Sequence, residues 1–175
     1  RKHRDEVGKE AAQQALGVDN LGMRMFTVFR ELAEVMSGLI IRRVKVNLGY
    51  SAQAALDATG RRQYTDRKVV DSMPKPESDL AEVHFFNLGR YVSDAELEKE
   101  YELRGLKPAD PHTLAAVNER EPDFADEHPN GTHWQDANGK WCFASFGRWR
   151  DERDVHVDRS GSVWDGRWWF AGVRK

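Results

Sequence analysis

The sequence predicts an α+β fold, with helices early in the chain and an antiparallel sheet or meander in its C-terminal half. Before residue 38, apolar residues recur at steps of three and four, which is the spacing of an amphipathic helix. After Thr132, short segments rich in aromatic and β-branched residues are separated by Asn-Gly, Ser-Gly and Asp-Gly dipeptides. Such dipeptides mark turns, so this region is typical of a sheet of short strands.

The first expected element is a helix that begins after Asp19 and ends at Gly38. Its apolar stripe consists of Leu21, Met25, Val28, Phe29, Leu32 and Met36. We therefore expect residues 1–38 to form a helical N-terminal extension and residues 39–175 to form a single α+β domain. An apolar stripe needs a covering surface, so it predicts self-association, a protein partner or docking onto the domain.

Two strands and a short helix are expected next. Alternation of apolar and polar residues in LIIRRVKVNLGY, and again in AEVHFFNLG, predicts half-buried strands. Between them, SAQAALDATG predicts a short helix that begins after its serine and ends at its glycine. The charged, proline-containing stretch that follows this helix is expected to be a loop with at most one short strand, around Val69-Val70.

The clearest helix signals lie between residues 91 and 120. Ser93 and Glu96 have the spacing of a capping box. In this motif the side chain of each residue accepts a hydrogen bond from the backbone N–H of the other. Gly105 suits the left-handed position that ends such a helix. Asp110 and Pro111 then suit the cap and the first position of a second helix.

A two-residue turn at Asn138-Gly139 is expected to form a hairpin. In that register Trp134 opposes Phe143, and Cys142 lies diagonally next to His133 on one face. The C-terminal WWFAGV is apolar on both faces, which predicts a central strand covered on both sides. We expect most tryptophans there to be core residues, and Trp164 and one indole of the Trp168-Trp169 pair are the ones that could form a ligand platform.

Composition restricts the possible functions. The 27 Lys and Arg are balanced by 29 Asp and Glu, for a net charge of −2, which argues against a general nucleic-acid coat but not against a local basic face. The single cysteine, Cys142, allows neither an internal disulfide nor a Cys-based zinc site. No secretory signal or membrane-length apolar run is visible. We therefore expect a cytoplasmic protein with no membrane contact and no cofactor, since nucleotide-binding and GxSxG motifs are missing as well.

Arginine and aromatic residues occur together in three stretches, RRVKV, GRRQYTDRK and FGRWRDER. Phosphate neutralisation combined with base stacking is how proteins hold single-stranded nucleic acid. The candidate residues for nucleic-acid or ligand binding are Arg42, Arg43, Lys45, Arg61, Arg62, Arg148, Arg150, Trp149 and Trp164. The alternative is a solvated face, because acidic residues are interleaved with these arginines.

A polar loop, PDFADEHPNGTHW, is the candidate metal site. Imidazole and carboxylate groups bind divalent metals, and Asp126, His128 and His133 would be the ligands. Their spacing matches no established metal motif, so the alternative is a solvated loop with local turn hydrogen bonds.

Several phrases from Leu39 onward carry a resemblance, among them ALDATGRRQYTDRKVVDSMP, RGLKPADP, FADEHPNGTHW and WWFAGVRK. In this order they resemble a group of small uncharacterised bacterial proteins. That group has no established activity, so the resemblance assigns no functional residue. It implies a bacterial, cytoplasmic protein and does not extend to the N-terminal helical stretch.

The sequence favours a binding or interaction module over an enzyme, because no catalytic motif accompanies its aromatic and charged residues. One alternative is single-stranded nucleic-acid binding through the arginine and aromatic residues. Another is a small metal-dependent or hydrolytic enzyme built on the loop from His128 to His133.

Overall fold

The computed structural model describes residues 21–22, 24–25, 28–29, 38–161 and 163–175. Contacts between residues divide the chain into two units, Arg1–Gly38 and Leu39–Lys175. In the first unit the described residues from 21 to 29 are helical, and the rest of the expected apolar stripe lies outside the described residues. None of the described helices combines the length and the apolar character that crossing a membrane requires.

The described residues of the second unit form an eight-stranded mixed sheet, so the α+β class is confirmed. Its strands are β1 (Leu39–Lys45), β2 (Arg62–Thr65), β3 (Leu80–Asn87), β5 (Leu106–Pro108), β6 (Asn130–Gln135), β7 (Trp141–Trp149), β8 (Glu152–Arg159) and β10 (Trp169–Arg174). Their order is β1-β3-β10-β6-β7-β8-β2, with β5 also paired to β10. The sheet is not wholly antiparallel as expected, because β10 runs parallel to β6 and β2 runs parallel to β8.

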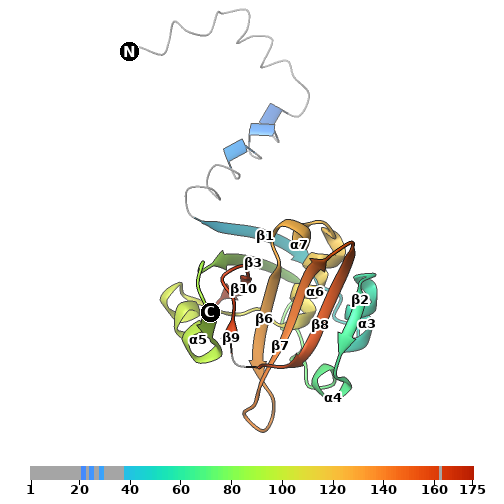
Figure 1. Cartoon of the computed structure of the whole chain (residues 1–175). Helices are drawn as coiled ribbons and strands as arrows, with labels where there is room; N and C mark the ends of the chain where they lie inside the picture. Colours follow the sequence, from blue (N-terminus) through green and yellow to red (C-terminus); the bar gives the residue numbers. More distant parts are fainter. Residues whose placement is uncertain (1–20, 23, 26–27, 30–37, 162) are drawn as a thin grey trace, which may run out of the picture. The chain divides into compact units, whose positions relative to one another are not determined.

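Helices and a two-stranded ribbon surround this sheet. The ribbon pairs β4 (Val92–Ser93) with β9 (Val163–Trp164). The helices are α3 (Ala52–Ala58), α4 (Arg67–Val70), α5 (Asp94–Leu103), α6 (Pro111–Arg120) and α7 (Phe124–Glu127). In Figure 1, α5 and β9 lie toward the β3 and β10 side of the sheet, whereas α3 and α4 lie beside β2 and β8.

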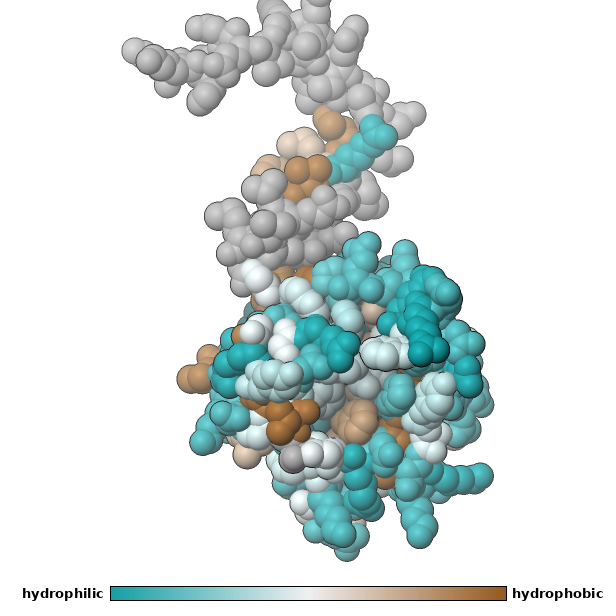
Figure 2. Space-filling model, viewed as in Figure 1, coloured by the Kyte–Doolittle hydropathy of each residue, from teal (hydrophilic) through white to brown (hydrophobic). Residues whose placement is uncertain are grey.

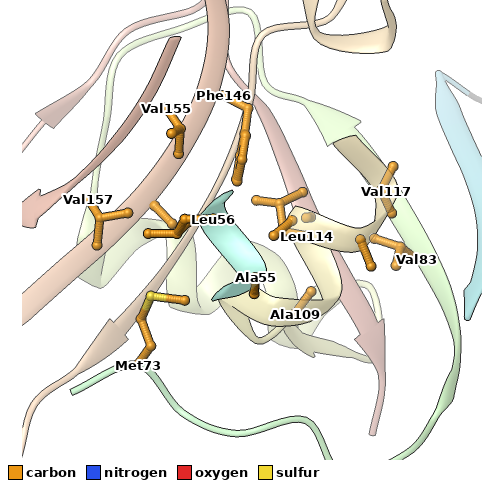
Figure 3. Packing of buried hydrophobic residues seen from close by; sticks show 14 of the residues in the cluster. Ala55, Leu56, Met73, Val83, Ala109, Leu114, Val117, Phe146, Val155 and Val157 are labelled. Carbon is orange, nitrogen blue, oxygen red and sulfur yellow. The ribbon is translucent and has the colours of Figure 1, made fainter. Parts of the chain in front are cut away.

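The larger core fills the space between one sheet face and helices α3 and α6. Leu56 from α3 and Leu114 from α6 are fully buried with Phe146 of β7 and Val155 of β8. Figure 3 shows these side chains converging from both helices and from the strands. Burial of such side chains is the main favourable contribution to folding.

A smaller core lies on the opposite face, beneath α5 and the β4–β9 ribbon. Its buried residues are Phe86, Val92, Leu97, Tyr101, Leu106, Trp164 and Phe170. The Tyr101 hydroxyl donates a hydrogen bond of 2.9 Å to the carbonyl of Ala171, which ties α5 to the sheet. Trp164 is 6% exposed, so the expectation that it forms a ligand platform is wrong.

Strand β10 is central and covered on both faces, as its sequence predicts. Phe170 belongs to the smaller core and Ala171 to the larger one. Gly172 lies where a Cβ atom would come within 3.0 Å of the Tyr101 ring and 3.1 Å of the Leu106 side chain. The chain therefore needs glycine here because α5 and β5 pack directly against the backbone.

The expected helix ends are confirmed by the structure. Ser93 and Glu96 form both hydrogen bonds of the capping box at the start of α5. Gly105, just after this helix, has a φ of 66°, in the left-handed region that glycine adopts readily. Asp110 caps α6 by accepting a hydrogen bond of 2.8 Å from the backbone of Thr113.

The predicted hairpin register is wrong by one residue. Beyond the ends of β6 and β7, the backbone of Asp136 also pairs with Lys140, so the turn between these two residues has three residues rather than two, and Gly139 adopts a φ of 72° within it. Trp134 therefore pairs with Cys142, and His133 pairs with Phe143. A shift of one residue moves every side chain to the other face, so His133 and Cys142 lie on opposite faces.

Three local expectations also fail between residues 60 and 130. Val69 and Val70 belong to the short helix α4, not to a strand, because the Asp66 side chain accepts hydrogen bonds from backbone groups of its first turn. The strand of this region is β2, a polar segment that pairs in parallel with β8. The polar loop expected before His128 contains helix α7, whose Phe124 is buried in the larger core.

The position of Phe170 predicts the effect of truncating its side chain. Phe170→Ala should lower the free energy of unfolding by about 3–5 kcal/mol, because it leaves a cavity between Phe86 and Trp164. Urea denaturation followed by tryptophan fluorescence measures this loss. Leu103→Ala is the control, since that side chain is 80% exposed at the end of α5 and should change stability by about 0.5 kcal/mol or less. Equal losses in the two variants would contradict a central position for β10.

Candidate functional site

A groove of about 400 Å³ lies over strands β7, β8 and β2, on the sheet face opposite the larger core. This volume is within the range of small-ligand sites. Because side chains alternate along a strand, the neighbours of the core residues on β7 and β8 face this groove. Its main lining residues are Tyr64, Phe143, Arg148, Trp149, Asp154, His156, Arg167 and Trp168. Figure 2 shows one face of the molecule, where hydrophilic residues surround smaller apolar areas.

Flat aromatic side chains form the walls of this groove. Tyr64 of β2 and His156 of β8 are register partners, and their rings stack with centroids 4.8 Å apart and an interplanar angle of 13°. Trp149 is 62% exposed at the end of β7, although tryptophan usually buries most of its surface. Trp168 adds a half-buried indole from the segment before β10. The groove therefore offers several π faces to a planar ligand.

The turn beside Trp149 has an uncommon backbone conformation. Trp149 pairs with Glu152, so β7 and β8 are joined by Arg150 and Asp151 alone. In the part of the chain that the structure describes, Arg150 is the one non-glycine residue with a positive φ, 58°. Such conformations are uncommon outside glycine, and they occur often at functional sites.

Three arginines border the groove in exposed ion pairs. Arg62 pairs with Glu152 and also lies over the Tyr64 ring, 5.2 Å from its centroid. Arg148 and Arg167 make ion pairs of 3.2 Å and 2.9 Å, with Asp126 and Asp165 respectively. Because exposed pairs stabilise a protein by only about 0–1 kcal/mol, these guanidinium groups can exchange partners at little cost.

One carboxylate oxygen at this site has no hydrogen-bond donor among the residues that the structure describes. Asp154 is only 6% exposed, and its Oδ1 atom has no hydrogen-bond partner among the described residues. It lies opposite Gly147 on β7 and opposite Arg62 on β2. Buried polar groups are nearly always hydrogen-bonded, so this oxygen is an unused acceptor in the groove.

A larger cavity, of about 680 Å³, lies near the C-terminal ends of β6 and β10. Charges of both signs line it, and several are already bonded to each other or to nearby groups. Lys107 contacts Glu77 at 2.9 Å, and Glu82 pairs with Arg43 at 2.8 Å. These pairs resemble those beside the groove, so it is the exposed indole of Trp149 that distinguishes the groove from this cavity.

His133 lies in the wall of this cavity, held between two carboxylates. Its Nδ1 atom is 2.9 Å from Oδ1 of Asp94, and its Nε2 atom is 2.9 Å from Oε1 of Glu98. Asp94 also accepts hydrogen bonds from the Ser160 hydroxyl and the Trp164 indole. The imidazole is fully buried, so the cluster joins α5 and β9 to the sheet rather than presenting a free base.

The charges of this cluster shift the pKa values of its members. Burial favours the neutral imidazole, but hydrogen bonds and charges from Asp94 and Glu98 outweigh burial and raise the pKa of His133 above its usual 6.5. Burial likewise opposes ionisation of Asp94. Hydrogen bonds from His133, Ser160 and Trp164 outweigh that effect and lower the pKa of Asp94 below its usual 3.8. Both shifts favour an ion pair inside the folded protein.

The structure separates the predicted arginine and aromatic residues into three groups. Arg42, Arg43 and Lys45 lie on β1, at the edge of the sheet opposite β2. Two further residues are buried: Arg61 donates to the carbonyls of Gly147 and Pro122, and Trp164 donates to Asp94. The remaining residues line or adjoin the groove, and they are Arg62, Arg148, Trp149 and Arg150.

The predicted metal ligands are not brought together. Asp126 is bonded to Arg153 and Arg148, whereas the His128 ring stacks on Phe124. His133 points toward Asp94 instead. Among the described residues, no group of three or more His, Cys, Asp or Glu side chains could hold a metal ion.

Cys142 is buried in the larger core, and burial raises the pKa of its thiol. A protonated, inaccessible thiol is a poor nucleophile, which suits a packing role.

Sequence reasoning missed several groove residues, namely Tyr64, Asp154 and His156, whereas Trp168 belongs to the pair expected to supply a platform indole. Asp154 and His156 alternate with the buried Val155 and Val157, which is the pattern of a strand with one apolar face. That period would have placed both polar residues on one face. Tyr64 could not be placed with them, because nothing in the sequence indicates that β2 pairs with β8.

The His133 cluster predicts a pH-dependent contribution to stability. A raised histidine pKa stabilises the folded state fully below the unfolded value of about 6.5, and this contribution is lost as the pH rises through the folded pKa. His133→Gln should therefore cost about 3 kcal/mol near pH 6 and less at higher pH. Urea denaturation of both proteins from pH 6 to pH 9 measures the difference.

The comparison with the variant is needed because other histidines change the pH dependence of stability in the opposite direction. Burial lowers the pKa values of His84 and His112, so those residues favour the folded state as the pH rises. Only the difference between wild type and His133→Gln isolates the cluster. A difference that is constant or grows with pH would contradict the ion pair.

Comparison with protein-family models, with curated protein sequences and with solved structures finds no match for this chain.

Proposed function

We propose that the protein is a binding module and that its groove binds single-stranded nucleic acid. The single observation that supports this most directly is the exposed indole of Trp149, beside the stacked rings of Tyr64 and His156. Base stacking on aromatic side chains contributes about 1–3 kcal/mol per base and accepts any sequence. A solvent-facing tryptophan contributes little to a core, so its ring is available to stack on a ligand.

The arginines around the groove supply the phosphate contacts. Arg62, Arg148 and Arg167 each carry five N–H donors, and the ion pairs described above use only part of them. A phosphate can therefore bind beside the acidic partner or replace it. The acidic partners limit the affinity, because they offset part of the positive charge that would attract a strand.

The dimensions of the groove favour one inserted base rather than a long track. A cavity of about 400 Å³ accommodates a nucleoside with its phosphate near the rim. Neighbouring nucleotides would then contact the exposed arginines on either side. We expect moderate affinity and binding of single strands in preference to duplex, whose bases are already stacked.

Replacing the exposed indole tests this proposal. Trp149→Ala should weaken binding of a labelled single-stranded oligonucleotide of mixed sequence by about 10-fold or more, since one stacking contact is lost. Fluorescence anisotropy at low salt measures the affinity. Tyr50→Ala is the control, because Tyr50 is an exposed aromatic residue of the loop between β1 and α3 and should leave affinity unchanged. No binding by the wild type at low salt would refute the proposal.

Salt dependence tests the role of the arginines. Three phosphate contacts predict a slope of roughly −2 for log affinity against log salt concentration, and Arg148→Gln should reduce its magnitude by about 0.7. The fold should tolerate this change, because Asp126 keeps its bonds to Arg153. Arg43→Gln, on the opposite edge of the sheet, removes the same charge outside the groove and should leave the slope unaltered.

A further inference from the structure

We infer that Asp154 makes the groove selective for guanine among the nucleic-acid bases, an inference that rests on the nucleic-acid binding proposed above. Oδ1 of this buried carboxylate has no hydrogen-bond partner among the described residues. Leaving a buried acceptor unpaired costs about 1–3 kcal/mol, and more for a charged group. A ligand whose N–H groups reach Oδ1 recovers this free energy. A ligand that only stacks on the aromatic rings does not.

Asp154 is not crowded from the β7 side. Its partner across the strand pair in β7 is Gly147, which has no side chain to fill the position beside the carboxylate. On its other side, in β2, lies Arg62, whose guanidinium is above Tyr64 and half-exposed. A base stacked on the aromatic wall can thus turn its edge toward Asp154 and its phosphate toward an arginine.

The carboxylate is covered in the free protein, so a wall side chain must move when the base enters. Trp149 and Tyr64 are 62% and 42% exposed, so their rings can rotate without opening either core. Trp149 directly precedes the hairpin turn at Arg150, where the strand pairing of β7 ends. Rotamer changes of this kind are common when interfaces form.

Guanine fits this acceptor better than the other bases do. Its Watson–Crick edge carries two adjacent donors, the N1–H and the 2-amino group, which match the two oxygens of one carboxylate. Adenine and cytosine place a ring-nitrogen acceptor next to their amino group, and that lone pair would face a carboxylate oxygen. Uracil and thymine place their N–H between two carbonyl oxygens. Guanine alone presents two neighbouring donors, so charge-assisted hydrogen bonds to Asp154 should distinguish it.

Quenching of tryptophan fluorescence by 5′-monophosphates tests the inference directly. Wild type should bind GMP roughly 10- to 100-fold more tightly than AMP, CMP or UMP, because two charge-assisted hydrogen bonds form only with guanine. Inosine monophosphate lacks only the 2-amino group, so its affinity should fall between those of GMP and AMP. These comparisons use unaltered protein and do not depend on the folding of a variant.

Asp154→Asn assigns the preference to the residue. It should remove the preference for GMP over AMP and leave the weaker affinity due to stacking. Asp158→Asn is the matched control, since Asp158 lies on the same strand and the same face, opposite Phe143, but outside the groove lining. That control should retain the full preference for GMP.

The possible outcomes separate the two proposals. If neither oligonucleotides nor nucleotides bind, the proposed function itself fails. If oligonucleotides bind but all four nucleotides bind equally, or if CMP is preferred, selectivity for guanine is refuted while nucleic-acid binding stands. If GMP is preferred equally by wild type and by Asp154→Asn, the assignment to Asp154 is refuted.

Discussion

The structure depends on β10 lying in the middle of the sheet. This strand pairs with β3, β5 and β6, which come from three separate parts of the chain. Its successive residues Phe170 and Ala171 enter the two cores on opposite faces. Its pairings with these strands all span long sequence separations. Such contacts are the slow part of folding.

The central strand also determines where the groove can lie. Helix α5 and the β4–β9 ribbon cover the face over β3 and β10, where the Tyr101 hydroxyl and the His133 cluster hold them. Strands β7, β8 and β2 extend past this cover, and the aromatic side chains on the same face border the groove. Helices α3 and α6 bury the other face of these strands, which keeps the floor of the groove rigid.

Local signals in the sequence were more informative than long-range ones. The capping box at Ser93 and the turn at Gly105 need only neighbouring residues, so they could be predicted. The hairpin failed by one residue because the Asp136 side chain accepts backbone hydrogen bonds and stabilises a longer turn. The predicted basic patch was divided for a different reason: the strand order places β1 and β2 at opposite edges, although they are close in sequence.

The two buried aspartates on this side of the sheet differ in how their carboxylates are hydrogen-bonded. Asp94 receives hydrogen bonds from His133, Ser160 and Trp164, so its burial is compensated and it ties three elements together. Asp154 is buried to a similar degree, but its Oδ1 has no such donor among the described residues. The fold pairs both oxygens of the first carboxylate and leaves one oxygen of the second unpaired. The proposed ligand would supply the donor that this acceptor lacks, beside the exposed aromatic rings.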